Sequence, residues 1–366
     1  MSAKVRVGMI GTSYWADDFH LPALASHPGA ELTAICGRDP ERASSLAHKH
    51  RVSQVFTDYE EMIDRAGLDA IVVATPEDLH HPMVMSALHA GLHVLCEKPL
   101  ALSAVQSQDM LIAAERAGVK HMVQFTNRGL PHYRYLKRLI ADGYIGDPYH
   151  AYFTWPTGWN PAQDINPYHW GFDARRSKGA VAELGAHLID VARWLFGDVV
   201  RVTGSMRMFV HPDVPDGAPM AEANDSAFVL LDFASGAHAV IHVGLRNIAG
   251  PGLRTGQTAV ISGSAGTIDT RADPWTAPAP AVSEIIGLRR GVDMAEALPV
   301  PEEYYGDTDP ADAFAVFRQQ SVGPRLFIDA IIHNLPIAPD FNDGHQVQRI
   351  IDAAVTSHET GTAQHL

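Results

Sequence analysis

Cysteine is almost absent from this sequence. Its 366 residues contain only two, Cys36 and Cys96. Two thiols cannot build the disulfide framework that holds small secreted proteins together. Each cysteine lies in an apolar run of strand character, so we interpret both as core residues and not as redox groups.

Positive charge and long apolar stretches are also scarce. Lys and Arg number 28 against 42 Asp and Glu, a formal net charge of −14, which gives no support for nucleic-acid binding. No run approaches the roughly 18 apolar residues of a membrane span. Lys4 and Arg6 stand inside the first Val/Ile run, which is not the order of a signal peptide. We therefore expect a cytoplasmic protein that binds neither nucleic acid nor membrane.

The sequence does have enough apolar residues, 46%, for large cores, and its length favours about two domains. Through the first third, short Val/Ile-rich runs alternate with helical patterns such as residues 40–50 and 103–117. The runs are residues 5–10, 32–36, 70–74, 93–96 and 121–125. Strand, helix, strand in repetition indicates right-handed crossovers and a parallel sheet with helices on both faces. We predict a doubly wound α/β domain over residues 1–125.

The pattern changes after Phe125. Residues 133–141 and 184–196 have helical patterns, and strand-like runs follow at residues 199–209, 227–233, 237–245 and 257–268. Sequential strands joined by short turns pair antiparallel. We predict a second, α+β domain over residues 126–366, interrupted by Pro/Gly-rich loops near 211–220 and 273–282.

The first apolar run leads into a candidate dinucleotide loop. Gly11, Ser13 and Ala16 stand in the register of the glycine fingerprint, in which small residues permit a tight turn, close approach to a pyrophosphate and strand–helix packing. Two of the three glycines are replaced, so the motif by itself is weak. Its place between a predicted strand and helix favours cofactor binding.

The end of the second run bears on the choice between NAD and NADP. Arg38 is placed for a bidentate contact with a 2′-phosphate, whereas no acid stands at Gly37 to bind a ribose hydroxyl. Asp39 is the competing ribose ligand, but Asp followed by Pro40 and Glu41 is also typical of a helix N-cap. We favour NADP(H) over NAD(H).

Two further segments follow predicted parallel strands, where ligands bind in open α/β sheets. They are residues 75–80, which end in His80, and Glu97-Lys98-Pro99. Glu97 and Lys98 can be an ordinary surface ion pair. Alternatively, Lys98 is a compact cation beside a reacting oxygen, aimed by backbone that Pro99 restricts.

These residues resemble the Gfo/Idh/MocA oxidoreductases, the family of glucose-fructose oxidoreductase and inositol 2-dehydrogenase. The segments that carry the resemblance are Gly11-x-Ser13-x-x-Ala16, Ala74-Thr75-Pro76-x-x-x-His80, residues 90–99, residues 178–190 and residues 341–361. The resemblance implies an N-terminal Rossmann domain and a C-terminal α+β domain with a large, mostly antiparallel sheet. It also implies a nicotinamide dinucleotide, a sugar or polyol substrate, and a homo-oligomer, a homodimer or homotetramer.

Within that resemblance, Lys98 matches the active-site lysine and His187 the catalytic histidine. Glu183 stands where many members have Asp. The residues themselves agree, because positions four apart share a helix face and an imidazole can remove a hydroxyl proton near neutral pH. A metal site built from His and Glu is the rival, but no third ligand has a recognisable spacing. We expect no metal.

The remaining candidates surround these groups. The expected cofactor-binding residues are Gly11, Thr12, Ser13, Tyr14, Trp15, Arg38, Thr75, Pro76, His80, Glu97, Lys98 and Asn127. The expected substrate-binding residues are Lys98, Arg128, Trp159, His169, Arg175, Glu183 and His187. The aromatic residues before the catalytic helix, Trp155, Trp159 and Trp170, fit stacking on a sugar face and core packing equally well.

We therefore predict reversible hydride transfer between a secondary hydroxyl, or its ketone, and a nicotinamide wedged between the two lobes. His187 exchanges the hydroxyl proton, Lys98 stabilises the developing oxyanion, and Glu183 orients the substrate or His187. Two alternatives remain open. One is an NAD-dependent glycosidase that oxidises its substrate transiently, and the other is a cofactor-sensing regulator without enzyme activity.

Overall fold

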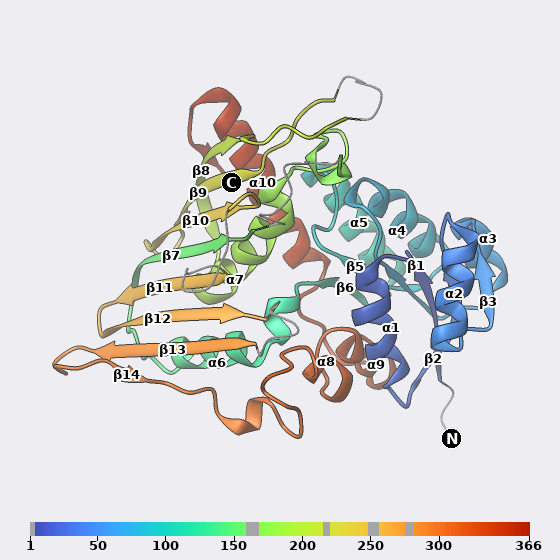
Figure 1. Ribbon diagram of the computed structural model, residues 1–366, viewed down its shortest axis with the longest axis horizontal. Coiled ribbons are helices and arrows are strands. Elements are labelled where there is room, and N and C mark those ends of the chain that lie inside the picture. The colour runs from blue at the N-terminus through green and yellow to red at the C-terminus, as the bar shows by residue number, and fades with distance from the viewer. Residues whose placement is uncertain (1–3, 159–167, 215–219, 248–255, 275–280) are drawn as a thin grey trace. The chain divides into compact units, whose positions relative to one another are not determined.

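The computed structural model describes residues 4–158, 168–214, 220–247, 256–274 and 281–366 (Figure 1). Its contacts divide the chain into two compact units. The first unit contains Met1–Gly129 and Phe314–Gln348, and the second contains Leu130–Ala313 and Arg349–Leu366. The sequence predicted a single division, between residues 125 and 126. The two units differ from that prediction because the late segment Phe314–Gln348 belongs to the first unit.

The first unit contains a parallel sheet of six strands in the order β3-β2-β1-β4-β5-β6. The strands are β1 (Val5–Ile10), β2 (Ala30–Cys36), β3 (Gln54–Phe56), β4 (Ala70–Val73), β5 (His93–Glu97) and β6 (His121–Gln124). This is the strand order of dinucleotide-binding doubly wound folds, and it confirms the predicted class. Of these strands, only the short β3 was not predicted from the sequence.

Helices connect these strands. They are α1 (Leu21–Ala25), α2 (Pro40–His50), α3 (Tyr59–Arg65), α4 (His80–His89) and α5 (Ala104–Ala117). Side chains cap three of them: Asp39 accepts from the backbone of α2, Asp58 from α3 and Ser103 from α5. The capping interpretation of Asp39 is therefore confirmed. Gly118, with φ of +64°, ends α5, in agreement with the helical pattern predicted over residues 103–117.

Apolar strands form the core of this unit, and the late segment completes it. Val7, Met9 and Ile35 are fully buried, and they share one cluster with Phe327 and Ile328 of α9 (Pro324–His333). This burial explains why residues far along the chain belong to the first unit. Cys36 and Cys96 are buried free thiols, and burial raises the pKa of Cys36 to about 11, which agrees with a core role.

The second unit contains a nine-stranded sheet in the order β14-β13-β12-β11-β7-β10-β9-β8-β15. The strands are β7 (Pro148–Pro156), β8 (Val199–Arg207), β9 (Ser226–Phe233), β10 (His238–Gly244), β11 (Gln257–Gly263), β12 (Gly266–Asp273), β13 (Val282–Arg289), β14 (Glu296–Ala297) and β15 (Gln364–His365). Neighbouring strands are antiparallel except β7 and β10, which are parallel. The predicted, mostly antiparallel sheet is confirmed.

Four of these strands, β7, β13, β14 and β15, were not predicted from the sequence, and two others were predicted as one. Residues 257–268 were predicted as one run, but Ser264 and Ala265 separate β11 from β12, and the two strands pair antiparallel. Gly266 begins the second strand where a Cβ would lie 2.8 Å from the carbonyl oxygen of Leu288 and 2.9 Å from that of Tyr144. A tight turn without Pro or Asn gave no strong signal.

Two helices of the second unit pack against each other, α6 (Pro131–Ala141) and α7 (Ala186–Phe196), and α7 also contacts β7 and β10. The chain continues through α8 (Val316–Gln319) and α9 to α10 (Phe341–Thr360), which passes from the first unit into the second. Among the described residues, every helix is too short or too polar to cross a bilayer.

Candidate active site

The turn after β1 requires glycine. Gly11 has φ of +120°, and a Cβ there would lie 2.2 Å from the carbonyl oxygen of Ala74, just beyond β4. The Ser13 hydroxyl accepts a hydrogen bond of 3.2 Å from the backbone N–H of Ala16 as the next helix begins. The strand order changes direction between β1 and β4, where doubly wound sheets bind dinucleotides. The Gly11 turn is thus as tight as the first turn of a dinucleotide-binding loop requires.

The second strand ends beside this loop. Gly37 follows β2, and a Cβ there would lie 2.5 Å from the Thr12 methyl group. Asp39 accepts hydrogen bonds of 3.0 and 3.1 Å from the N–H groups of Glu41 and Arg42. Arg38 is exposed and has no hydrogen bond or ion pair to any residue that the structure describes. Its guanidinium is therefore available to an anion.

Lys98 follows β5 and is anchored through the residue before it. Oε1 of Glu97 accepts hydrogen bonds from Trp15 Nε1 at 2.7 Å and from His20 Nε2 at 2.8 Å. Its Oε2 accepts from the backbone N–H of Lys98 at 3.1 Å. The Trp15 ring also stacks on Phe19, with centroids 4.4 Å apart. The loop after β1 and the end of β5 are thus tied together by one carboxylate.

His80 supports the same edge of the sheet. Its ring is buried, with Nε2 2.9 Å from the carbonyl oxygen of Thr75 and Nδ1 3.0 Å from that of Pro99. Burial lowers the pKa of His80 below its ordinary value. Both nitrogens face backbone carbonyl oxygens, and a neutral imidazole donates to one of them, so the ring joins the loops after β4 and β5. The cofactor contact expected for His80 stays a prediction.

Asn127 and Arg128 lie in a short 3₁₀ turn, Thr126–Gly129, after β6. Asn127 is buried, and both terminal nitrogens of Arg128 pair with the Asp343 carboxylate at 3.2 and 3.1 Å. A bidentate, largely buried pair of this kind is strong and directional. Arg128 therefore fixes the turn against α10. The substrate contact expected for Arg128 stays a prediction.

In the second unit, Glu183 and His187 lie on one helix, as predicted. The helical segment opens with a π-turn over Val181–Gly185 and continues as α7. Gly179, with φ of +70°, precedes it, and a Cβ there would lie 2.3 Å from the backbone oxygen of Asn224. Such π-turns recur at functional sites. The first unit also has one, Ala16–His20, which carries His20.

Aromatic and charged groups surround this helix. The His187 ring lies 5.8 Å from the Trp155 ring, centroid to centroid. His169 Nδ1 accepts from the Gly171 N–H at 3.2 Å, and a Cβ on Gly171 would be 3.7 Å from the Glu183 carboxylate. Burial, together with the charges of Arg176 and Arg246, lowers the pKa of His169 against an opposing effect of Glu183. His169 and Glu183 are therefore brought together.

One expected substrate residue has its charge paired elsewhere. Arg175 pairs with Asp173 at 2.6 Å, and its side chain is 66% exposed. Trp159 lies outside the described residues. The sequence analysis missed Arg246, whose guanidinium carbon lies 4.7 Å from the centre of the Phe172 ring, because it follows a strand and matches no motif.

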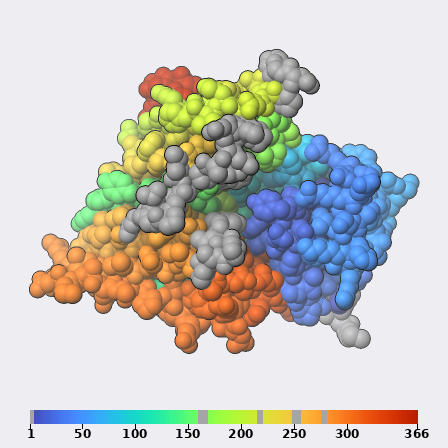
Figure 2. Space-filling model, in the orientation of Figure 1, coloured from blue at the N-terminus to red at the C-terminus, as the bar shows by residue number. Residues whose placement is uncertain are grey.

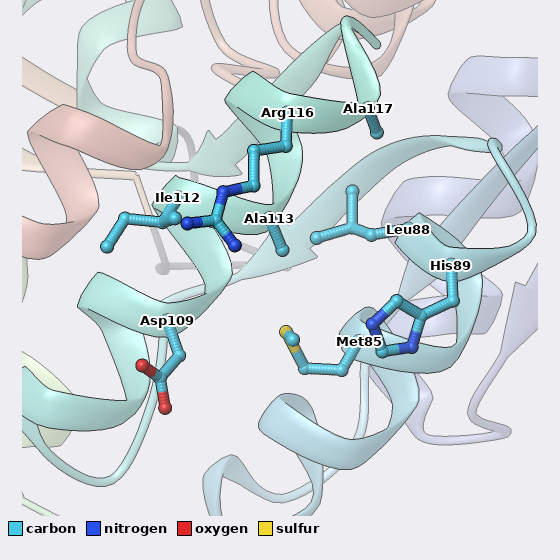
Figure 3. Close-up of a pocket in the computed structure, with 8 residues that line it drawn as sticks. All are labelled: Met85, Leu88, His89, Asp109, Ile112, Ala113, Arg116 and Ala117. Atoms are coloured by element: carbon cyan, nitrogen blue, oxygen red, sulfur yellow. The ribbon is translucent and has the colours of Figure 1, made fainter.

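No group of three or more His, Cys, Asp or Glu side chains among the described residues could hold a metal ion. A separate hollow of about 470 Å³ lies between α4 and α5, where side chains from the two helices point toward one another (Figure 3). It is lined by Met85, Leu88, His89, Asp109, Ile112, Ala113, Arg116 and Ala117. None of these is an expected site residue.

Known proteins resemble this chain along most of its length. Residues 5–125 match the family model "Oxidoreductase family, NAD-binding Rossmann fold", and residues 133–269 match "GFO/IDH/MocA C-terminal domain". D-apiose dehydrogenase of Paraburkholderia graminis is 29% identical over 74% of this chain and 68% of its own length. D-xylose 1-dehydrogenase [NADP(+)] of Haloarcula marismortui is 28% identical over 67% and 71%. The crystal structure of an NAD binding oxidoreductase from Klebsiella pneumoniae superposes with a TM-score of 0.84, at 28% identity and 99% coverage of both chains.

Proposed function

Because this chain belongs to the GFO/IDH/MocA family of oxidoreductases, we propose that it interconverts a secondary hydroxyl and a ketone of a sugar, inositol or related polyol. The observation that carries the proposal is the edge of the first sheet. There the Gly11 turn, the loop held by His80 and the Glu97-anchored Lys98 follow β1, β4 and β5. Relatives named as sugar dehydrogenases support the substrate class.

The residues divide the reaction between them. A bound nicotinamide dinucleotide supplies the hydride acceptor in oxidation and the donor in reduction. His187 takes the hydroxyl proton during oxidation and returns it during reduction, a contribution typically of about 10²- to 10⁴-fold. Lys98 stabilises negative charge that develops on the substrate during oxidation. Glu183, beside His169, orients the substrate by accepting hydrogen bonds from the substrate's hydroxyl groups.

Gly11, Thr12 and Ser13 would hold the pyrophosphate, and Arg38 would bind the 2′-phosphate of NADP(H). The absence of a partner for Arg38 among the described residues supports this preference. Tyr14, Thr75, Pro76 and Asn127 follow the strands β1, β4 and β6 and belong to the same binding edge. NAD(H) is the alternative, with Asp39 available for a ribose hydroxyl.

Turnover of two variants tests the proposal. Sugars, inositols and their keto forms are screened with NADP(H) and NAD(H), first by thermal shift and then by absorbance at 340 nm. With the best substrate, His187→Ala and Lys98→Met should each lower kcat at least about 10²-fold. His358→Ala, at an exposed position of α10, is the control. Near-parental turnover in both variants contradicts the proposal, and sugar release without net cofactor reduction indicates the glycosidase alternative.

A homodimer or homotetramer is part of this proposal, formed through the open face of the nine-stranded sheet. Tyr152 is 53% exposed, Phe228 50% and Ile286 43%. Tyr152 pairs in register with Val260 of β11, and Phe228 stacks on His242 at 4.1 Å. Strand β13, in orange, lies at the surface in Figure 2. Apolar side chains gathered on one face mark an interaction surface. Tyr152→Asp should lower the mass measured by light scattering to that of the monomer, and an unchanged mass contradicts this interface.

A further inference from the structure

A buried negative charge lies beside Lys98. The Glu97 side chain is 10% exposed, and both of its oxygens accept hydrogen bonds. Trp15 donates through its indole N–H, which is the single polar group of a tryptophan side chain. His20, whose side chain is fully buried, donates through Nε2. Three N–H groups, two from residues 15–20 and one from the residue after β5, therefore converge on one carboxylate.

These contacts keep Glu97 ionised. Burial alone would raise the pKa of the Glu97 carboxyl, but the hydrogen bond from His20 and the attraction of His20 and Lys98 lower it below its ordinary value. The hydrogen bond from the Lys98 backbone acts in the same direction. The protein thus maintains an anion where a neutral side chain would cost less to bury.

The position of this anion matters because the two forms of the cofactor differ in charge. The nicotinamide ring is cationic when oxidised and neutral when reduced. With Arg38 after β2 at the adenosine half of the dinucleotide, the nicotinamide half would lie toward β4 and β5, on the other side of the Gly11 turn. An ammonium there repels the oxidised ring and not the reduced one.

We propose that Glu97 and Lys98 form an opposed charge pair that sets how tightly the protein holds oxidised relative to reduced dinucleotide. Glu97 favours the oxidised form and Lys98 the reduced form. Trp15 and His20 are positioning residues that hold the carboxylate in place. The inference rests on the proposed function in one respect, the presence of Lys98 beside the reacting carbon.

The test measures binding without substrate. Dissociation constants of NADP+ and NADPH, and of NAD+ and NADH, are obtained by titration calorimetry for the full chain. The readout is the dissociation constant of the oxidised dinucleotide divided by that of the reduced dinucleotide. Glu97→Gln keeps the shape of the side chain and should raise the ratio about tenfold, whereas Lys98→Met should lower it by a similar factor. The double variant should return it close to the parental value.

A ratio that rises in one variant and falls in the other indicates a charge effect. Structural damage would instead change the dissociation constants of both forms of the dinucleotide alike. His27→Gln is the matched control, because it removes an imidazole–carboxylate contact of 2.9 Å, to Asp329, elsewhere in the first unit. Its ratio should not change. An unchanged ratio in both test variants, or a change in the same direction, overturns the charge pair. If Glu97→Gln does not fold, a ratio for Lys98→Met that is unchanged or raised overturns it alone.

The same variants separate this inference from the proposed function. Loss of turnover in Lys98→Met with an unchanged ratio refutes the charge pair and leaves the proposed reaction intact. Parental turnover with a lowered ratio refutes the role of Lys98 in the reaction and leaves the charge pair intact.

Discussion

His132 makes the stability of this protein depend on pH in a way that one substitution isolates. The side chain is buried at the start of α6, and burial lowers the pKa of His132 to about 3 from an ordinary value of 6.5. Thr270 donates its hydroxyl proton to the carbonyl oxygen of Glu284, so it accepts from His132 Nε2 at 2.6 Å. Nδ1 then accepts from Ser283 at 3.0 Å. These bonds define a neutral imidazole with its proton on Nε2.

The sign of the effect follows from the lowered pKa. Below pH 6.5 the unfolded chain binds a proton at His132 while the folded protein does not, so stability is lost as the pH falls from 6.5 toward 3. Between pH 7.5 and pH 5 the loss from this residue is about 2 kcal/mol.

Urea unfolding at the two pH values measures this loss. His132→Gln removes the titrating group, so the stability difference between parental protein and variant should shrink by about 2 kcal/mol at the lower pH. His358→Gln, at an exposed histidine, should show no such change. An equal difference between parental protein and His132→Gln at both pH values would refute the reasoning.

Two further predictions concern the end of β2. Asp39→Ala removes the N-cap of α2 and should lower the free energy of unfolding by about 1 kcal/mol, measured by urea denaturation, with Asp39→Asn as the variant that preserves the cap. A stability unchanged in Asp39→Ala contradicts the capping role. Arg38→Ala should raise the KM for NADP(H) about 10- to 100-fold and leave that for NAD(H) and the melting temperature unchanged. A preference for NAD(H) that the substitution does not alter contradicts the assignment of Arg38.

Local sequence determined much of the first unit. The periodic runs predicted five of its strands. Asp39 and Ser103 begin helices and Gly118 ends one, where their chemistry requires. Lys98, Glu183 and His187 were predicted as site residues from short motifs and family resemblance. Such features depend on neighbours a few residues away, so the sequence displays them directly.

Only the tertiary structure decided how these groups are held. Glu97 binds Trp15 and His20, which are 82 and 77 positions away, and Arg128 binds Asp343, which is 215 away. The return of α9 to the first unit and the parallel pairing of β7 with β10 are equally non-local. Contacts between residues so distant depend on burial and strand order, and no local pattern in the chain encodes them.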